Sequence, residues 1–411
     1  MRSNLRALIC ACTGLVVFSA PVPAQPSQLQ ELLSQPVGIE RSAARVDVPM
    51  EVRFGKLFIQ AQVNGVPREF IFDTGSPTIL SRELADSLEL EVLGENTGRD
   101  ANGTEVSMLF VRVARLEIGE LAFIDVPALV FDFSSNDTGR CVIDGGVIGS
   151  EILPGSRWRL DAQAAQISVF APGTSRVEEA LFASSYLHDF GYPHAPIVDY
   201  SVGEVRDRAL FDTGSAGELS LFSRVLEDGS VRRQLAGDSI TRGHGYEGES
   251  AGGLGPVREL VRFRTDGVAL GGQALGRLDG VARASPPSLL GAGLLGRFNV
   301  TLDYTTSRFE LVERDQPDAM GSTPGYGLAF SDGQLIVSQL YAGSAAADSG
   351  LQLNDHVLAV NERATHGLDP QQRCELLDWM LEAQPTRSDA RLRILRNGEE
   401  RVFDVPAGDA D

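Results

Sequence analysis

The sequence predicts a mainly β protein in which two similar lobes are followed by a small α+β unit. The 44 glycines and 20 prolines among its 411 residues mark many turns, as in a strand-rich chain. The motif Phe-Asp-Thr-Gly-Ser occurs twice, at 72–76 and 211–215, and similar apolar segments follow each copy. The chain beyond residue 320 does not continue this repeat and includes a helical pattern at Gln371–Leu381. A chain of this length is expected to hold two to three domains.

The repeat sets the expected domain boundaries. Strand-like alternation begins at Val48, and a second strand-rich segment carries the second copy of the motif. We predict a signal peptide (1–24), a linker (25–47), lobe 1 (48–172), a connector (173–195), lobe 2 (196–314) and a C-terminal unit (321–408).

The composition is ordinary for a soluble globular protein. Hydrophobic residues make up 43% of the chain and charged residues 22%. The formal net charge of −20 argues against a nucleic-acid-binding protein and against attraction to an anionic membrane surface. Lys56 is the only lysine among 36 basic residues, a bias to which we attach no function.

The N-terminus has the pattern of an export signal. Two arginines within the first six residues precede the short apolar run Ala7–Ala20, and Val22-Pro23-Ala24 offers a cleavage point before Gln25. The run is short for a membrane span, although an uncleaved anchor is the alternative. We therefore expect a periplasmic or secreted protein. Whether the expected linker also serves as a pro-segment is left open.

The cysteines and histidines predict neither a disulfide framework nor a metal site. Cys10 and Cys12 lie in the expected signal, so the mature chain keeps Cys141 and Cys374, which fall in different predicted domains. No HExxH motif or paired CxxC is present, and the five histidines are scattered. The Gly-rich segment 291–296 matches GxGxxG, but a strand pattern follows it instead of the helix that a dinucleotide site needs. We expect no cofactor.

Each copy of the motif is followed at a matching distance by two apolar residues and a glycine. These triplets are Val147-Ile148-Gly149 and Leu289-Leu290-Gly291. Gly149 lies 76 residues after Asp73, and Gly291 lies 79 residues after Asp212. A single Asp-Thr-Gly is a weak signal, but two copies with matching surroundings indicate two related lobes.

An Asp-Thr-Gly loop after an apolar strand can supply half of an acid–base site. The strand fixes the aspartate at its end, and the glycine allows a tight turn and a close approach by another segment. Two such loops related by a pseudo-twofold axis would bring two carboxylates together, and the pair would share one proton. One oxygen could then activate a water molecule while the other carboxylic acid donates its proton to a carbonyl oxygen.

Both lobes resemble the aspartic peptidase family, with the single-chain pairing of the pepsin-like arrangement. The short lobes and the segment after them are similar to the retropepsin-like proteins of bacteria that carry two such lobes and a PDZ domain. The resemblance covers about 48–314 and 321–408, and it implies β-barrel lobes with an α+β PDZ-like domain. It also implies an aspartic endopeptidase with Asp73 and Asp212 as its catalytic pair and a polypeptide substrate.

The family pattern assigns supporting roles to the residues around the two aspartates. These residues are Thr74, Gly75, Ser76, Thr213, Gly214 and Ser215. The resemblance implies that the threonines lock the two loops together and that the serines hydrogen-bond the outer carboxylate oxygens. By hypothesis, the serines stabilise the ionised pair and lower its apparent pKa values. Gly149 and Gly291 are expected to pack beneath the loops.

Two segments are candidates for a flap over the cleft. The first is the 99–105 segment with Asn102, Gly103 and Thr104 at its tip, which lacks the tyrosine typical of pepsin-like flaps. The second is the Gly-rich stretch 243–253, which contains Tyr246. The alternative for both is a plain surface hairpin.

The C-terminal unit resembles a PDZ domain. Its Gly327-Leu328-Ala329-Phe330 segment is similar to the carboxylate-binding loop of that family. Such a loop would hold a terminal carboxylate on backbone N–H groups while the adjacent strand edge accepts an extended peptide. The alternative is a docking domain that binds only its own lobes.

Two further functional alternatives remain. A non-catalytic peptide-binding or scaffold protein could keep the lobes without turnover, although such decay would usually remove one aspartate. A lobe could also pair with the lobe of another chain, although two loops in one chain favour a monomeric pseudo-dimer.

Overall fold

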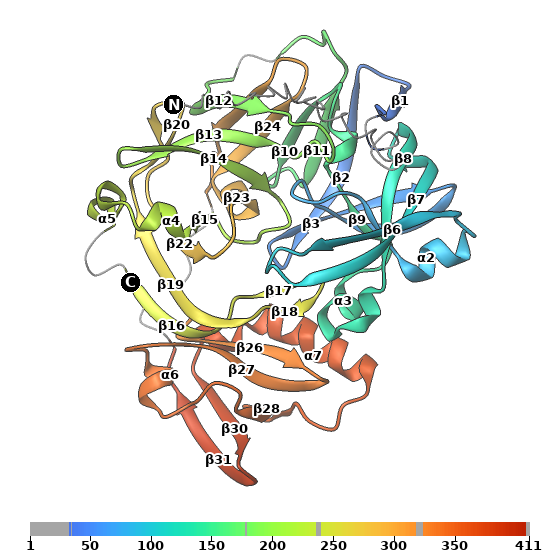
Figure 1. The fold of residues 1–411 in the computed structure, drawn as a ribbon. Helices are drawn as coiled ribbons and strands as arrows, with labels where there is room; N and C mark the ends of the chain where they lie inside the picture. The colour runs from blue at the N-terminus through green and yellow to red at the C-terminus, as the bar shows by residue number, and fades with distance from the viewer. Residues whose placement is uncertain (1–32, 34, 177–178, 236–239, 318–323, 408–411) are drawn as a thin grey trace, which may run out of the picture.

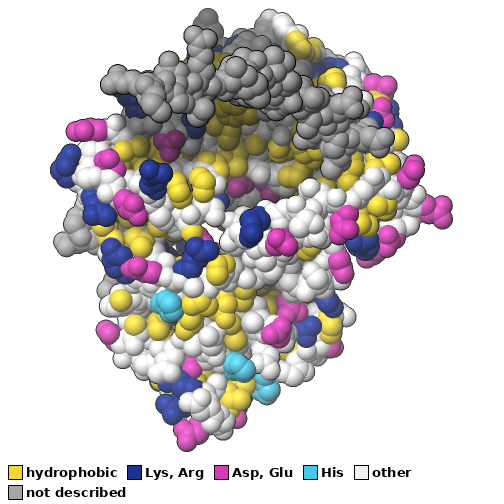
Figure 2. All heavy atoms as spheres, in the orientation of Figure 1, with side chains coloured by type: hydrophobic (Ala, Val, Ile, Leu, Met, Phe, Trp, Pro, Cys, Tyr) yellow, Lys and Arg dark blue, Asp and Glu magenta, His cyan; other side chains and the backbone are white. Residues whose placement is uncertain are grey.

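The structure is a computed structural model that describes residues 33, 35–176, 179–235, 240–317 and 324–407, so the predicted signal peptide lies outside it. The described part is mainly β, and the C-terminal unit lies against both lobes (Figure 1). Among the described residues, no helix is long and apolar enough to cross a membrane. On the face in Figure 2, acidic and basic side chains are interspersed.

Lobe 1 contains eleven strands and two short helices. The strands are β1 (Gly38–Arg41), β2 (Arg45–Arg53), β3 (Lys56–Val63), β4 (Val66–Phe72), β5 (Ile79–Ser81), β6 (Val92–Arg99), β7 (Glu105–Ile118), β8 (Leu121–Phe131), β9 (Gly146–Ile148), β10 (Arg157–Asp161) and β11 (Gln166–Phe170). The helices are α2 (Arg82–Ser87) and α3 (Asp137–Val142). β1 pairs with β8 and lies inside the predicted linker 25–47, so that prediction was wrong for its last part.

Lobe 2 follows β12 (Ala183–His188), a strand inside the predicted connector. Its strands are β13 (Ile197–Val202), β14 (Val205–Asp212), β15 (Leu219–Phe222), β16 (Thr241–Tyr246), β17 (Glu249–Ser250), β18 (Gly253–Leu254), β19 (Val257–Thr265), β20 (Val268–Leu270), β21 (Gln273–Ala274), β22 (Leu278–Arg283), β23 (Ser288–Gly291), β24 (Phe298–Asp303) and β25 (Arg308–Glu313). Its helices are α4 (Ser223–Leu226) and α5 (Gly229–Gln234).

The repeated motif occupies the same topological place in both lobes. The strand before each aspartate pairs in parallel with the strand that ends in the apolar pair: β4 with β9, and β14 with β23. Each of these apolar strands also pairs with the short strand after the motif, which is β5 in lobe 1 and β15 in lobe 2. The strands β5, β9, β15 and β23 are short and largely apolar. They form the buried centre of each lobe.

A six-stranded antiparallel sheet joins the lobes. Its order is β2-β11-β10-β24-β25-β12, and the central pairing of β10 with β24 places Trp158 opposite Leu302. Alternating residues of β2 are buried, as expected for a strand with one face on a core. Buried side chains of both lobes form one continuous apolar cluster, so the two lobes share a core.

The C-terminal unit has a separate core. Its strands are β26 (Tyr326–Ser331), β27 (Gln334–Tyr341), β28 (His356–Val360), β29 (Arg363–Ala364), β30 (Ala390–Arg396) and β31 (Glu399–Val405). Its helices are α6 (Ala345–Asp348) and α7 (Pro370–Ala383). Asp369 caps α7, and its side chain accepts the N–H of Gln372 in a capping box. Leu376, Leu377 and Leu392 are among the buried residues of this second core.

The C-terminal unit is joined to each lobe by a different kind of bond. β27 pairs with β16 of lobe 2, with Gly243 opposite Tyr341. Cys141 of α3 and Cys374 of α7 form a disulfide, with Cα atoms 5.0 Å apart. The expectation of no disulfide was therefore wrong, because residues from different predicted domains meet at the contact between α3 and α7.

Candidate active site

Each aspartate stands at the end of a buried strand. Phe72 and Phe211, which precede the aspartates, are 1% and 0% exposed. Asp73 N donates to Ile148 O at 2.9 Å, and Asp212 is the last residue of β14, opposite Gly291 of β23. The apolar strands thus fix both aspartates at the same level of the two lobes, where the chain leaves the core.

Two threonines join the loops across the lobe boundary. Thr74 Oγ1 donates to Phe211 O at 2.6 Å and accepts the N–H of Thr213 at 3.1 Å. Thr213 Oγ1 donates to Phe72 O at 2.7 Å and accepts the N–H of Thr74 at 3.0 Å. Both threonines are fully buried, at 1% and 0% exposure. This reciprocal set of four hydrogen bonds fixes the two loops relative to each other.

The aspartates meet across this contact. A Cβ atom added to Gly75 would lie 2.5 Å from Cγ of Asp212, and one added to Gly214 would lie 2.2 Å from Oδ2 of Asp73. Each carboxyl group therefore rests against the glycine of the other loop, and any side chain there would collide with it. Within its own loop, each aspartate accepts a glycine N–H through Oδ1, at 2.8 Å from Gly75 and 2.9 Å from Gly214.

The pair is arranged to hold a proton. Burial, followed by the charge and hydrogen bonding of Asp73, raises the pKa of the Asp212 carboxyl to about 7. The N–H of Gly214 and the charge of Lys56 act in the opposite direction. Lys56 begins β3 in lobe 1 and reaches across to lobe 2, where its Nζ donates to Gly214 O at 2.5 Å. The β3–β4 hairpin, which pairs Leu57 with Phe72, brings Lys56 beside the first motif, but no sequence pattern predicts its contact with lobe 2.

The predicted role of the flanking serines was wrong. Ser76 Oγ donates its proton to Pro77 O at 2.7 Å, so the hydroxyl turns along its own loop. In the part of the chain that the structure describes, no hydrogen bond joins Ser215 Oγ to Asp212. The expected lowering of the pKa does not hold for Asp212, because burial and the neighbouring Asp73 outweigh the loop N–H groups.

The glycines of the apolar triplets lie directly against the motif loops. A Cβ atom on Gly149 would lie 2.3 Å from Ser76 O, and one on Gly291 would lie 2.6 Å from Ser215 O. Neither position leaves room for a side chain. The two glycines thus permit the close contact between each loop and the strand that follows it.

Glu151 is a buried carboxyl group behind the first loop that sequence reasoning missed. Its two carboxylate oxygens lie 3.2 and 3.1 Å from the N–H of Thr78, whose Oγ1 accepts the N–H of Gly149 at 3.0 Å. Burial raises the pKa of Glu151 to about 7, although the hydrogen bonds from Thr78 oppose this. A glutamate is normally exposed, so only its place two residues after Gly149 could have drawn attention to it.

The candidate first-lobe flap is the tip of the hairpin formed by β6 and β7. Asp100 Oδ1 accepts the N–H groups of Asn102 and Thr104 at 3.0 and 2.8 Å, which shapes the 100–104 turn around Gly103. Asn102 Nδ2 donates to Gly248 O at 3.3 Å. The tip therefore bridges from lobe 1 to the Gly-rich loop of lobe 2.

Tyr246, the second flap candidate, is held by the C-terminal unit. Its hydroxyl donates to Asn354 Oδ1 at 2.9 Å, and its carbonyl accepts Gln339 Nε2 at 2.9 Å, both in the C-terminal unit. The pairing of β16 with β27 draws this end of the strand toward the C-terminal unit. No sequence pattern predicts that strand pairing.

The predicted carboxylate-binding loop is a strand. Gly327, Leu328, Ala329 and Phe330 lie within β26 and pair with β27, with a register shift after Gly327. Their N–H groups are therefore not all free to hold a carboxylate. The apolar residues Leu328 and Phe330 instead pack against the core of the C-terminal unit.

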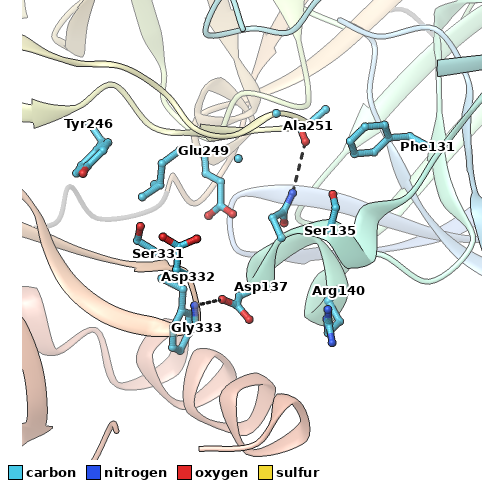
Figure 3. A pocket seen from close by; sticks show the side chains of 15 residues that line it. Phe131, Ser135, Asp137, Arg140, Tyr246, Glu249, Ala251, Ser331, Asp332 and Gly333 are labelled. Carbon is cyan, nitrogen blue, oxygen red and sulfur yellow. Dashed lines mark hydrogen bonds between the residues drawn. The ribbon is translucent and has the colours of Figure 1, made fainter. Parts of the chain in front are cut away.

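A cavity of about 560 Å³ lies at the junction of the two lobes and the C-terminal unit. Figure 3 shows Asp137, Glu249 and Asp332 around it, with Gly333 N donating to Asp137 at 3.0 Å. Burial raises the pKa of Glu249. Neither aspartate of the pair lines this cavity, so it belongs to the interface with the C-terminal unit.

Comparison with known proteins supports the interpretation of lobe 1. Residues 59–152 match the family described as aspartyl protease, a range that includes Asp73 and Gly149. Among solved structures, the crystal structure of an aspartic proteinase from Irpex lacteus matches with 12% identity and a TM-score of 0.42, over 67% of this chain and 99% of that chain. No curated protein matches the chain. The family match supports an aspartic peptidase, a hydrolase, and it leaves lobe 2 and the C-terminal unit uncovered.

Proposed function

We propose that the protein is an aspartic endopeptidase that hydrolyses peptide bonds with Asp73 and Asp212. The observation that carries the proposal is the contact of the two strand-end carboxyl groups across reciprocal threonine hydrogen bonds. The family match of lobe 1 supports the same chemistry. A scaffold protein would not need two acidic groups held together at the cost of their mutual repulsion.

In the proposed mechanism one aspartate acts as the acid and the other as the base. Asp212, whose pKa is raised, carries the shared proton, and Asp73 accepts a proton from a water molecule. The water oxygen bonds to the carbonyl carbon while Asp212 gives its proton to the carbonyl oxygen. The tetrahedral diol then collapses: the nitrogen takes the proton that Asp73 received from the water, the C–N bond breaks, and a diol hydroxyl returns its proton to Asp212 as the carboxyl product forms. No covalent enzyme intermediate is needed.

The test is cleavage of an unfolded protein by the wild type, Asp73→Asn and Asp212→Asn. We expect both variants to lose nearly all activity, because each removes one of the two groups that hold the shared proton. Asp207→Asn is the matched control, since Asp207 is an exposed residue of the same strand β14. Equal cleavage by all four proteins, or by none, would refute the proposal.

We also propose that the protein is exported to the periplasm or the surrounding medium. The disulfide between Cys141 and Cys374 supports this, because disulfides persist in oxidising compartments. The expected outcome is a mature protein that begins at Gln25 and is recovered outside the cytoplasm. N-terminal sequencing of the fractionated protein tests it, and an unprocessed chain that starts at Met1 would contradict it.

We infer that the C-terminal unit is a PDZ-like module. The lobes of the same chain occupy the side, between a helix and a strand edge, on which such a module would bind a peptide. In a PDZ-type site, a peptide adds to a strand edge beside a helix. Here α3 of lobe 1 contacts both β26 and α7, and Val142 packs against the core of the unit. Asp137 accepts Arg373 Nε at 2.7 Å, and both side chains are largely buried. These contacts favour the docking alternative over free binding of peptide C-termini.

Peptide binding before and after removal of the disulfide tests this role. A library of peptides with free C-termini is titrated against the wild type and a Cys141→Ala/Cys374→Ala variant. Docking predicts weak binding by the oxidised wild type and stronger binding by the variant, because α3 can then leave the groove. Tight binding of equal strength by both would favour the peptide-binding function instead.

A further inference from the structure

Arg283 is the last residue of β22 and occupies a position that has a counterpart in lobe 1. The parallel pairing of β15 with β22 places Phe222 opposite Arg283. The equivalent pairing of β5 with β8 places Ser81 opposite Phe131. The neighbouring strands β9 and β23 pair at matching positions, so Arg283 and Phe131 are equivalent. The pseudo-twofold axis therefore relates a cation in lobe 2 to an aromatic ring in lobe 1.

Arg283 begins the loop that lies beside the tip of the lobe 1 hairpin. The negative charges of Asp212 and Glu247 both act on its guanidinium group. The next residue, Ala284, donates its N–H to Glu247 Oε1 at 3.0 Å. A Cβ atom on Gly103 of the hairpin tip would lie 4.0 Å from Oγ of Ser285. The loop that starts at Arg283 therefore faces the lobe 1 hairpin at the boundary between the lobes.

The guanidinium group of Arg283 has no partner in the part of the chain that the structure describes. Its Nη1 is buried without a hydrogen bond, and neither a hydrogen bond nor an ion pair connects the group to another described side chain. Buried polar groups in proteins are almost always hydrogen-bonded, and an arginine cannot escape by losing its proton. Burial lowers the pKa of Arg283, which reflects the unfavourable removal of its charge from water.

The two nearby carboxyl groups are already engaged. Glu247 Oε1 accepts the N–H of Ala284, and its Oε2, which makes no hydrogen bond to another described residue, forms an ion pair with Arg258 Nε at 3.1 Å. Asp212 accepts the N–H of Gly214 and interacts with Asp73. A full ion pair between Arg283 and Asp212 would also remove the proton that the proposed mechanism needs. The buried Nη1 of Arg283 can therefore donate hydrogen bonds to a carboxylate that enters between the lobes.

We propose that Arg283 forms a carboxylate-binding subsite beside Asp212, which selects polypeptides that carry an acidic group on the lobe 2 side of the cut bond. The acidic group is either an Asp or Glu side chain or the terminal carboxylate of the substrate. A guanidinium group suits this ligand because it can donate two parallel hydrogen bonds to a carboxylate. This inference rests on the proposed peptidase function.

The experiment compares pairs of short peptides that differ only in Glu against Gln at each position flanking the cut. A second pair differs only in a free against an amidated C-terminus placed near the cut, which separates the two sources of the carboxylate. We expect the wild type to cleave one acidic peptide with a kcat/KM about ten- to a hundredfold higher than its amide partner. Arg283→Gln should reduce that ratio to about one, and Arg283→Lys should keep part of it.

The matched control is Arg277→Gln, which removes an exposed arginine just before the same strand and should keep the wild-type ratio. Cleavage of every peptide pair at equal rates by the wild type would overturn the subsite and leave the peptidase proposal intact. If the wild type cleaves nothing, the proposed function fails. In that case the subsite is tested by binding alone. Calorimetric titration measures the affinity of the wild type for acidic and amide peptides that carry a reduced, uncleavable bond, and equal affinities would overturn the subsite.

Discussion

Thr74 and Thr213 illustrate how much depends on single hydroxyl groups. Each hydroxyl both donates and accepts across the lobe boundary, so each side chain satisfies backbone groups that no other partner can reach in the buried loop contact. A side-chain hydroxyl group is therefore required at both positions.

Thr74→Val should destabilise the protein by about 2–4 kcal/mol, because it leaves Phe211 O and the N–H of Thr213 buried without partners. Thr74→Ser retains the hydroxyl and should lose much less. Urea unfolding of the two variants measures the difference. Equal stabilities of Thr74→Val and the wild type would contradict the role of this hydroxyl.

Lys56→Met should move the pH–activity profile to higher pH. Lys56 lowers the pKa of Asp212, so its removal raises that pKa above its present value of about 7 and the pair holds its proton to higher pH. Asp73 and Arg283 also act on Asp212 and are unchanged in this variant. Measurement of kcat/KM from pH 3 to 9 provides the test, with Lys56→Arg as the charge-preserving control. A shift to lower pH would contradict the assignment.

Glu151 should make the protein less stable as pH rises from about 4.5 to about 7. Its folded-state pKa is raised from 4.5 to about 7, so the folded protein binds the proton more tightly and loses this stabilisation when the proton leaves. The fully buried group accounts for roughly 2–4 kcal/mol of that change. Glu151→Gln should flatten the pH dependence of the unfolding free energy in this range. A variant with the wild-type slope would show that another group is responsible.

The sequence could indicate the residues that the repeat marks, but not those that only the folded chain brings near. Asp73 and Asp212 stand out because two copies of one motif occur with similar surroundings. Lys56 begins β3, the hairpin partner of β4, and the register that sets Leu57 opposite Phe72 brings it beside Asp73, so a hairpin pattern could have indicated it. Arg283 belongs to a strand that is remote from both motifs in sequence, so no local pattern connects it to them. The predicted role of the serines failed because a hydroxyl group can donate to any nearby carbonyl oxygen, and Ser76 Oγ donates to Pro77 O.

At the scale of elements, the strands around each motif were foreseeable and the contacts of the C-terminal unit were not. Apolar alternation and turn signals locate β3 and β4, and the helical pattern locates α7. β16 could not be assigned to an interface, because edge pairing depends on backbone groups that every sequence carries. The assignment of Gly327–Phe330 to a loop failed for a related reason, since two glycines near a strand do not end it.

The link between α3 and α7 should stabilise the C-terminal unit on the lobes. The disulfide closes a loop between residues 233 apart in sequence, so it greatly restricts the unfolded chain. Cys141→Ala/Cys374→Ala should lower the free energy of unfolding by about 2–5 kcal/mol. Thermal unfolding of the variant and of the wild type with and without reductant measures the loss. Peptide mapping without reductant should recover the two cysteines in one linked fragment, and separate fragments would contradict the link.

At the scale of the whole molecule, the two lobes form one cooperative unit. The β10–β24 pairing places strands of both lobes in one sheet, and a single apolar cluster extends through both. Neither lobe can bury its share of that surface alone. The sequence repeat identified the two lobes, but it gave no information about how much core they share.

A fragment of residues 35–176 should not be a stable monomer, because it lacks β24 and the loop partners of Thr74. We expect it to show no cooperative thermal transition at low concentration, or to associate with a second copy. Circular dichroism and sedimentation test this, and the full chain, expected to be monomeric, is the control. A cooperatively folded monomeric fragment would contradict the shared core.

The C-terminal unit is attached to lobe 2 through paired strands and to lobe 1 through a covalent bond. It therefore works as a brace that spans the two halves on one side. Any rocking of one half against the other that widened this side would have to shear the strand pairing or pull on the sulfur link. Relative motion of the two lobes is thus restricted to rotation about the braced side, and a polypeptide substrate of the proposed peptidase would have to enter and leave from the opposite side.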